Sequence, residues 1–229
     1  RSLNYNLITY GCNPNGNNIN KNCGALEQKR LSNITLSSKA NLGISFDGDA
    51  DRVIICDNMG KIVDGDYILA IIAYHLRKKN KKELSFVSTK MSNLAFRKYL
   101  KKLNINLFLT DVGDRYVVEK MKKIDAFVGG EQSGHIIFSN DSYCGDGILT
   151  ALYILCIVEE EKKDLSTLCN LLFTKTPQKL INFKLNNFNN DIINSDSVLD
   201  LITKYEELGC DILLRKSGTE NVLRLMIQS

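Results

Sequence analysis

The chain has 229 residues, of which 44% are hydrophobic, and its 30 basic and 26 acidic side chains give a formal net charge of +4. This composition excludes a disordered chain. The charges are mostly intermingled, and the lysine clusters at 77–82 and 98–102 fall near expected helix ends, so nucleic-acid binding is a minor alternative. We found no run long enough to span a membrane and no signal peptide. Seven cysteines without a C-x-x-C pair indicate a reduced protein, and we expect a cytoplasmic one without nucleic-acid or membrane partners.

The first quarter of the chain is expected to contain a hairpin. Asn6–Thr9 predicts a short strand, and the Gly-, Asn- and Pro-rich stretch Gly11–Asn22 predicts a loop. Two apolar runs, Leu42–Phe46 and Val53–Cys56, predict strands on either side of an acidic loop. A tight turn after them predicts that Lys61–Val63 returns as a further strand.

The middle of the chain alternates between strands and helices, which predicts a largely parallel sheet with helices on its faces. The expected elements are a helix over Tyr67–Lys79, a strand Leu84–Ser88, a helix from a Ser92 cap to Leu103, a strand Ile105–Thr110, a helix Tyr116–Lys123 and strands Ala126–Val128 and Ile136–Phe138. Helices then follow from Asp146 to Glu160 and from an Asp164 cap to Phe173.

A break at Thr176-Pro177 predicts a domain boundary. Beyond it we expect strands around Ile181–Leu185 and Ile212–Leu214 with a helix Ser197–Leu208 between them, which is a small α+β domain. The predicted fold class is therefore α/β with mixed, largely parallel sheets, followed by that small domain.

The acidic loop is the leading candidate for a metal site. Asp47, Asp49 and Asp51 alternate within five residues, and three carboxylates this close repel one another unless a cation lies among them. Oxygen ligands of this kind suit Mg²⁺ or Ca²⁺. Arg52, beside the cluster, could balance its charge or hold a phosphate.

The acidic loop has two other interpretations. A solvated acidic turn stays open, since Asp and Gly are common turn residues. A calcium EF-hand is excluded, because Arg52 stands at the sixth loop position where glycine is needed, Asn58 stands at the twelfth where glutamate is needed, and strands flank the loop.

Polar residues also follow each strand of the predicted parallel sheet, at 89–93, 111–115 and 129–135. In the last of these, GGEQSGH, an extended backbone would place Glu131, Ser133 and His135 on one face. A carboxylate, a hydroxyl and an imidazole together can bind sugar hydroxyls, and His135 could also transfer a proton. A polar β-turn before the strand Ile136–Phe138 is the alternative. His75 is expected to be a surface or packing histidine.

The stretch RKSGTE, Arg215–Glu220, is a candidate phosphate-binding loop. Arg215 and Ser217, with the backbone amides freed by Gly218 and the hydroxyl of Thr219, could bind a phosphate, and Arg224 could reach back to it. A plain hairpin turn is the alternative.

These three motifs in this order, DGDADR at 47–52, GEQSGH at 130–135 and RKSGTE at 215–220, resemble those of the α-D-phosphohexomutase family. The stretches GCNPNGNNIN at 11–20 and VGDRYVVEKM at 112–121 are similar to its phosphoglucosamine mutase subgroup, with phosphoglucomutase and phosphomannomutase as the alternative. The resemblance implies a Mg²⁺-dependent phosphoryl exchange between the 6- and 1-positions of an amino sugar, through a bisphosphate and a phosphoserine enzyme. Such a step leads toward amino-sugar nucleotides and cell-wall precursors.

The resemblance also implies roles for individual residues. Metal ligands would be Asp47, Asp49 and Asp51, and Arg52 would contact the phosphoryl group that the metal polarises. Glu131 and Ser133 would bind sugar hydroxyls, and His135 would be the proton-transfer group. The phosphate that is not reacting would be anchored by Arg215, Ser217, Gly218, Thr219 and Arg224.

The chain departs from the family pattern at the nucleophile. The family's phosphorylated serine lies in a Ser-His-Asn segment of an N-terminal domain, and this sequence contains no such segment. We therefore expect a truncated fragment with the end of domain two (1–63), domain three (64–174) and a shortened domain four (175–229). Its expected partners are a hexosamine phosphate and the missing N-terminal segment, and a non-catalytic module that binds Mg²⁺ or sugar phosphate is the alternative.

Overall fold

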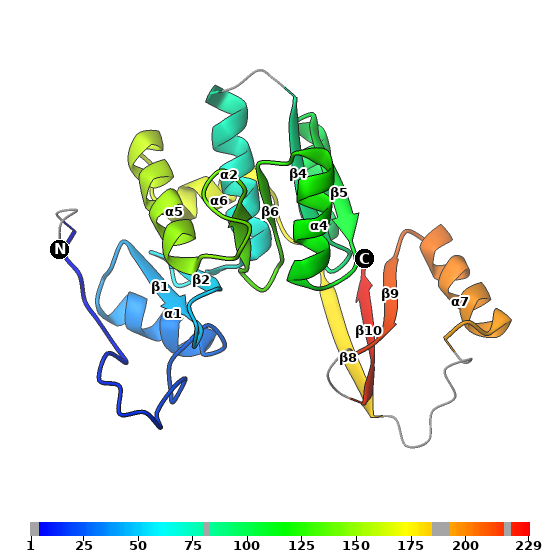
Figure 1. Ribbon diagram of the computed structural model, residues 1–229, viewed down its shortest axis with the longest axis horizontal. Coiled ribbons are helices and arrows are strands. Elements are labelled where there is room, and N and C mark those ends of the chain that lie inside the picture. Colours follow the sequence, from blue (N-terminus) through cyan, green and yellow to red (C-terminus); the bar gives the residue numbers. More distant parts are fainter. Residues whose placement is uncertain (1–4, 80–82, 185–192, 218–220) are drawn as a thin grey trace.

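The computed structural model describes residues 5–79, 83–184, 193–217 and 221–229 (Figure 1). Within these ranges the elements are α1 (Gln28–Ser37), β1 (Leu42–Phe46), β2 (Val53–Asp57), β3 (Ile62–Val63), α2 (Gly65–Lys79), β4 (Leu84–Thr89), α3 (Leu94–Lys102), β5 (Ile105–Thr110), α4 (Asp114–Ile124), β6 (Val128–Gly130), β7 (Ile136–Phe138), α5 (Gly147–Glu161), α6 (Leu165–Leu172), β8 (Gln178–Lys184), α7 (Asp196–Glu207), β9 (Asp211–Lys216) and β10 (Val222–Gln228). The α/β fold class predicted from the sequence is confirmed.

The first sheet is antiparallel, with the strand order β1-β2-β3. In its hairpin Leu42 faces Asp57 and Phe46 faces Val53, as the apolar runs predicted. The buried carboxylate of Asp57 accepts the backbone N–H groups of Met59 and Lys61, each at 2.9 Å, and so fixes the turn into β3. This sheet carries the acidic loop at the end of β1.

The strand predicted at Asn6–Thr9 is wrong. Residues 5–10 lie in an irregular, exposed segment and pair with no other strand in the described ranges. Apolar alternation makes a segment suitable for a sheet, but a strand forms only when a neighbour satisfies its backbone groups.

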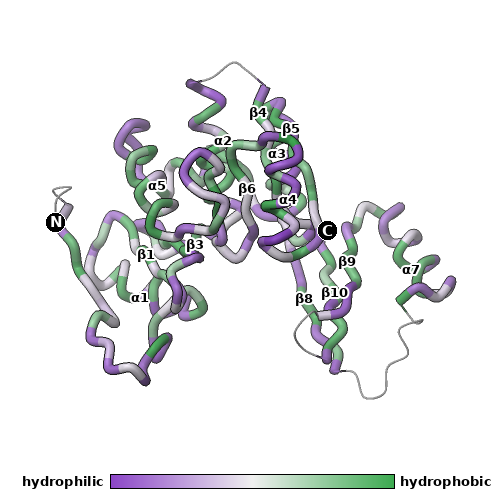
Figure 2. The backbone as a smooth tube through the Cα atoms, viewed as in Figure 1, coloured by the Kyte–Doolittle hydropathy of each residue, from purple (hydrophilic) through white to green (hydrophobic). Residues whose placement is uncertain are grey.

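The second sheet has the order β5-β4-β6-β7, in which β4, β5 and β6 are parallel and β7 runs antiparallel to β6. Alternate residues of β4 enter different cores. Val87 packs with Val117 and Met121 of α4 on one face, whereas Phe86 packs with α2 and α3 on the other. Hydrophobic and hydrophilic positions alternate along α4, as expected for a helix that covers one face of a sheet (Figure 2).

Helix α2 is the centre of the larger core. Its residues from Gly65 to Ala73 are buried, and it packs against α3, α5 and α6. The acidic end of α5 lies beside the basic end of α2, where Lys78 pairs with Glu161 and Lys79 with Glu160. His75 is 8% exposed and lies between these two glutamates.

Several sequence-based caps and boundaries differ from the structure. Helix α3 is capped by Asn93, whose side chain accepts the N–H of Ala95, because the Ser92 hydroxyl lies 2.6 Å from that of Ser88 instead. Strand β6 begins at Val128, two residues later than expected. Asp164 precedes α6 but makes no capping hydrogen bond with its side chain.

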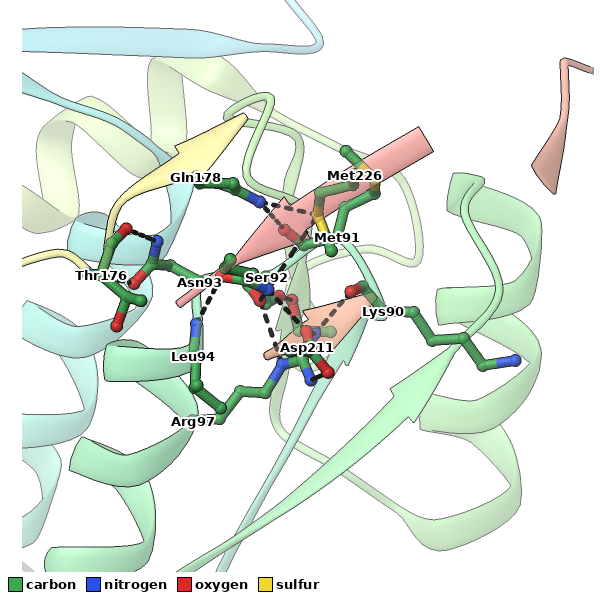
Figure 3. Close-up of polar contacts among 12 residues, drawn as sticks. Lys90, Met91, Ser92, Asn93, Leu94, Arg97, Thr176, Gln178, Asp211 and Met226 are labelled. Carbon is green, nitrogen blue, oxygen red and sulfur yellow. Dashed lines mark hydrogen bonds and ion pairs between the residues drawn. The ribbon is translucent and has the colours of Figure 1, made fainter. Parts of the chain in front are cut away.

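The third sheet is antiparallel, with the order β8-β10-β9, and α7 packs beside β9. Figure 1 shows it at the opposite end of the molecule from β1 and β2, with the four-stranded sheet between them. Polar contacts join it to the segment after β4 (Figure 3). Arg97 pairs with Asp211 at 3.1 Å, and the buried Gln228 accepts the N–H of Leu94 at 2.9 Å. Among the helices described, none is long and apolar enough to cross a membrane.

Candidate active site

The acidic loop connects the two paired strands of the first hairpin. Because Phe46 and Val53 face each other, the residues between them turn back sharply, with Ala50 at a positive φ of 59°. Carboxylate oxygens of Asp47, Asp49 and Asp51 consequently lie within 4.8 Å of one another. The pairing of β1 with β2 thus gathers the three side chains that the sequence singled out.

Arg52 lies against this cluster. Its Nε is 2.7 Å from Oδ2 of Asp47 and 3.3 Å from Oδ1 of Asp51, and its backbone N–H donates to Oδ1 of Asp47 at 3.0 Å. Burial opposes ionisation of Asp47, but the contacts from Arg52 and Asp51 outweigh it, so the pKa of Asp47 is lowered. Burial and the neighbouring Asp47 raise the pKa of Asp51, against the opposing effect of His135. The single positive charge of Arg52 therefore does not fully compensate the negative charge of the three carboxylates.

The donor set fits a hard divalent cation. All three ligands offer carboxylate oxygens, which Mg²⁺ and Ca²⁺ prefer. Oδ2 of Asp47 is buried and has no hydrogen-bond partner in the described structure, although Arg52 lies close to it. Burying such an oxygen destabilises the folded protein unless a further positively charged group approaches it.

The GGEQSGH motif forms a tight turn between β6 and β7. The N–H of Glu131 donates to the carbonyl of His135, and the N–H of Gly134 donates to the carbonyl of Glu131, both at 3.0 Å. The prediction of one extended face is therefore wrong: Glu131 and His135 stand at the base of the turn, and Ser133 lies exposed near its tip. Hydrogen bonding within the motif favours the turn over an extended strand.

The turn contacts the acidic loop directly. Nδ1 of His135 lies 3.0 Å from Oδ2 of Asp51, and the N–H of Val53 donates to the carbonyl of Gly134 at 3.1 Å. Gly145 closes over the imidazole, since a Cβ there would lie 2.4 Å from the ring. The N–H of Gly147 donates to the carbonyl of Ala50 at 2.9 Å. Two distant segments, the GGEQSGH turn and the start of α5, thus hold the loop in place.

The same turn contacts the ends of the parallel strands. The N–H of Gly113 donates to Oε1 of Glu131 at 3.0 Å. Lys90, after β4, pairs with Asp111, after β5, at 2.7 Å. Because β4, β5 and β6 are parallel, these polar residues share one edge of the sheet, as the sequence predicted.

On the third sheet, Arg215 of β9 lies directly opposite Arg224 of β10. Burial and the charge of Arg224 lower the pKa of Arg215, whereas the carboxylate of Glu131 opposes that shift. The buried Nε of Arg215 makes no hydrogen bond in the described ranges. Two facing arginines repel each other, so an anion between them would be stabilising.

Within the predicted phosphate loop, Ser217 is buried and its N–H donates to the carbonyl of Val222 at 2.9 Å. Gly218 and Thr219 lie outside the described residues.

Sequence reasoning missed Gln132, which links the turn to the third sheet. Its Nε2 donates to Oδ2 of Asp66 at 3.0 Å and to Oε1 of Gln178 at 2.9 Å. Asp66 is fully buried, and burial, aided by the charge of Asp64, raises its pKa to about 6. The position of Gln132 inside the motif was a usable signal, but the burial of Asp66 was not readable from the sequence.

Comparisons with known proteins show which sequences and folds the chain is similar to. Residues 64–176 match the profile of the phosphoglucomutase/phosphomannomutase family, alpha/beta/alpha domain III. Phosphoglucosamine mutases of Brevibacillus brevis and Finegoldia magna are 45% and 39% identical to the chain over 226 and 232 residues. Residues 64–176 therefore form a domain of the phosphohexomutase family. These matches include 97% and 99% of the chain but 50% and 51% of the relatives, so the chain spans about half the length of the curated relatives it matches.

Solved structures of the superfamily share the fold. A substrate complex of an N-acetylglucosamine-phosphate mutase superposes with a TM-score of 0.73 at 22% identity, and the match covers 92% of the chain and 50% of that protein. An Aspergillus fumigatus N-acetylphosphoglucosamine mutase in complex with GlcNAc-6P and magnesium superposes with a TM-score of 0.73 at 20% identity, and the match covers 94% of the chain and 54% of that protein.

Proposed function

We propose that this chain provides the metal, sugar and distal phosphate sites of a phosphoglucosamine mutase, which interconverts glucosamine 6-phosphate and glucosamine 1-phosphate. The observation that carries the proposal is the position of the GGEQSGH turn. Its His135 contacts Asp51 of the acidic loop, and its Glu131 lies within electrostatic range of Arg215. A sugar held at this turn would have the acidic loop near one end and the two arginines near the other.

The proposed reaction moves one phosphoryl group at a time. A phosphoserine supplied by a segment that this sequence lacks would transfer its phosphoryl group to the 1-hydroxyl of glucosamine 6-phosphate. The P–O bond to serine breaks as the bond to the sugar oxygen forms, which gives the 1,6-bisphosphate. The 6-phosphoryl group then returns to the serine, and glucosamine 1-phosphate leaves.

Each predicted residue has a role in that scheme. Asp47, Asp49 and Asp51 would hold Mg²⁺, which supplies positive charge to the phosphoryl oxygens when bound. Arg52 would neutralise the same oxygens. His135, oriented through Nδ1 by Asp51, would exchange a proton with the reacting hydroxyl.

The rest of the site would position the sugar. Glu131 and Ser133 would bind sugar hydroxyls, and Arg215 and Arg224, with Ser217, Gly218 and Thr219, would bind the phosphate that is not reacting. Positioning of this kind lets the bisphosphate bind in two orientations, with either phosphate toward the serine. We place this activity in the cytoplasm, on phosphorylated sugars.

A reconstitution assay tests the proposal. The chain would be mixed with the part of the Brevibacillus brevis relative that it does not match, and conversion of glucosamine 6-phosphate would be followed by ³¹P NMR with Mg²⁺ and glucose 1,6-bisphosphate. We expect turnover only when both parts are present, and its loss in Asp49→Asn. Faster turnover of glucose or mannose phosphates would contradict the sugar assignment. A stable complex that binds glucosamine 6-phosphate without turnover would contradict the mutase assignment and favour the binding module.

A further inference from the structure

Gln132 of the GGEQSGH turn contacts the start of helix α2 with both its backbone and its side chain. Its carbonyl accepts the N–H of Gly65 at 3.1 Å, and its Nε2 donates to Oδ2 of the buried Asp66 at 3.0 Å. The approach is close, because a Cβ at Gly65 would lie 1.9 Å from the carbonyl oxygen of Glu131. The turn therefore rests on the helix at the centre of the larger core.

The same side-chain amide also reaches the third sheet. Nε2 of Gln132 donates to Oε1 of Gln178, the first residue of β8, at 2.9 Å. Gln178 is itself held, since its Nε2 donates to the carbonyl of Met91 at 3.0 Å (Figure 3). An amide nitrogen carries two N–H groups, and here each has an acceptor on a different element. Both hydrogen bonds form only while α2 and β8 keep their present spacing.

The strands of the third sheet extend this link to the two facing arginines. β8 pairs with β10, where Asn182 stands opposite Arg224, and Arg224 stands opposite Arg215 of β9. Glu131 precedes Gln132 in the turn, and its carboxylate opposes the lowering of the pKa of Arg215. A path of direct contacts thus runs from the expected sugar ligand Glu131 through Gln132 to the expected phosphate ligand Arg215.

A second set of contacts holds the third sheet independently of Gln132. Oδ2 of Asp66 accepts the N–H of Asn93 at 2.9 Å as well. The side chain of Asn93 donates to the carbonyl of Thr176 at 2.9 Å and accepts its N–H at 3.0 Å, just before β8 begins. Loss of the Gln132 amide should consequently leave the sheet attached and the chain folded.

We propose that Gln132 is a positioning residue that fixes the distance between Glu131 and Arg215, and so sets the length of sugar phosphate that the site accepts. The inference rests on the proposed function, in which the sugar binds at the turn and its phosphate at the arginines. A ligand that reaches both groups binds well only when their spacing is correct. An anion that contacts the arginines alone does not depend on that spacing.

Calorimetric titration of the full, Mg²⁺-loaded chain with glucosamine 6-phosphate and with inorganic phosphate tests the proposal. Gln132→Met keeps the length of the side chain and removes both N–H donors, and Gln28→Met makes the same change at the exposed start of α1. We expect Gln132→Met to weaken glucosamine 6-phosphate about tenfold and phosphate less than about threefold. Gln28→Met should change neither. Equal effects of Gln132→Met on the two ligands, including no effect on either, would overturn the proposal.

Gln178→Met separates positioning from a direct contact between Gln132 and the sugar. It breaks the same link from the third sheet, outside the turn, so we expect the same selective loss of glucosamine 6-phosphate affinity. The double variant should bind about as well as either single variant, because both substitutions remove one shared contact. Additive losses, or a normal affinity in Gln178→Met, would overturn the proposal.

Hydrogen exchange distinguishes failure of this inference from failure of the proposed function. In Gln132→Met, the amides of Gly65 and Gly134 should exchange about tenfold faster or more, while those of α1 keep their wild-type rates. This measurement needs no sugar. If the wild-type chain does not bind glucosamine 6-phosphate, the proposed function fails, and faster exchange at these amides would still support positioning of the turn by Gln132. Unchanged exchange would overturn it.

Discussion

Nδ1 of His135 lies 3.0 Å from Oδ2 of Asp51, and this contact joins two turns that are 84 residues apart in the chain. The backbone hydrogen bond from Val53 to Gly134 lies beside it. The acidic loop and the GGEQSGH turn therefore contact each other through both side chains and backbone, and the carboxylate of Asp51 orients the imidazole.

The close approach of these two turns predicts a large cost for Gly134→Ala. Its Cβ would lie 2.0 Å from the carbonyl oxygen of Val53, and its φ is +92°. Gly209→Ala is the matched control, because Gly209 has the same φ of +92° and no atom within 4 Å of an added Cβ. In both variants the alanine must adopt a left-handed backbone conformation, which destabilises the folded state by about 1 kcal/mol. We expect Gly134→Ala to lose roughly 3 kcal/mol more in urea denaturation, and equal losses would show that the turns do not touch.

The acidic cluster predicts that Asp49→Asn lowers Mg²⁺ affinity. Asp49 is exposed and belongs to the cluster of three carboxylates, so its replacement removes a charged ligand and leaves the hairpin intact. Loss of one charge-assisted contact of about 1.5–3 kcal/mol corresponds to a decrease of roughly ten- to a hundredfold. Isothermal titration with Mg²⁺ measures it, and the exposed Asp125→Asn serves as the control. Unchanged affinity would remove the metal assignment.

Asp66 predicts a pH-dependent stability. Burial raises its pKa from 3.8 to about 6, so the native state holds this proton more tightly than the unfolded state. Ionised Asp66 destabilises the folded state. This destabilisation is absent below the pKa of the unfolded state and grows as the pH rises toward 6, to on the order of 3 kcal/mol. Asp66→Asn cannot ionise, so its free energy of unfolding should improve relative to wild type between about pH 4 and pH 7. Urea denaturation at both ends of that range tests this, and a constant difference would contradict it.

The facing arginines predict a phosphate effect. Arg215→Gln removes one of the two charges and their mutual repulsion, so we expect no loss of thermal stability without phosphate. Inorganic phosphate should raise the melting temperature of the wild-type chain but not of the variant. The exposed Lys179→Gln, on β8 of the same sheet, should keep the wild-type response. If phosphate stabilises Arg215→Gln as much as wild type, the arginines are not its site.

The sequence was most informative where chemistry and periodicity coincide. The acidic loop between two apolar runs, the alternation of strands and helices and the polar strand ends could all be predicted, because each depends on residues close in the chain. Whether Asp47, Asp49 and Asp51 bind metal, and where the domains divide, stay predictions.

What could not be predicted depends on contacts between distant segments. Residues 5–10 have the composition of a strand, but pairing decides whether a strand forms. The GGEQSGH motif was expected to be extended, yet Gly134 folds back because its carbonyl accepts the N–H of Val53. Burial of Asp66 and the position of Gln132 between two sheets follow from packing alone.

The central claim is that these loops form one site for a hexosamine phosphate, and calorimetric titration of the Mg²⁺-loaded chain with glucosamine 6-phosphate tests it most directly. Glu131→Gln is the decisive variant, since glutamine retains the oxygen that accepts the N–H of Gly113 and loses only the charge. We predict 1:1 binding by the wild-type chain and a decrease of about tenfold or more in Glu131→Gln and in Arg215→Gln. Absence of binding, or equal affinity in all three proteins, would contradict the account.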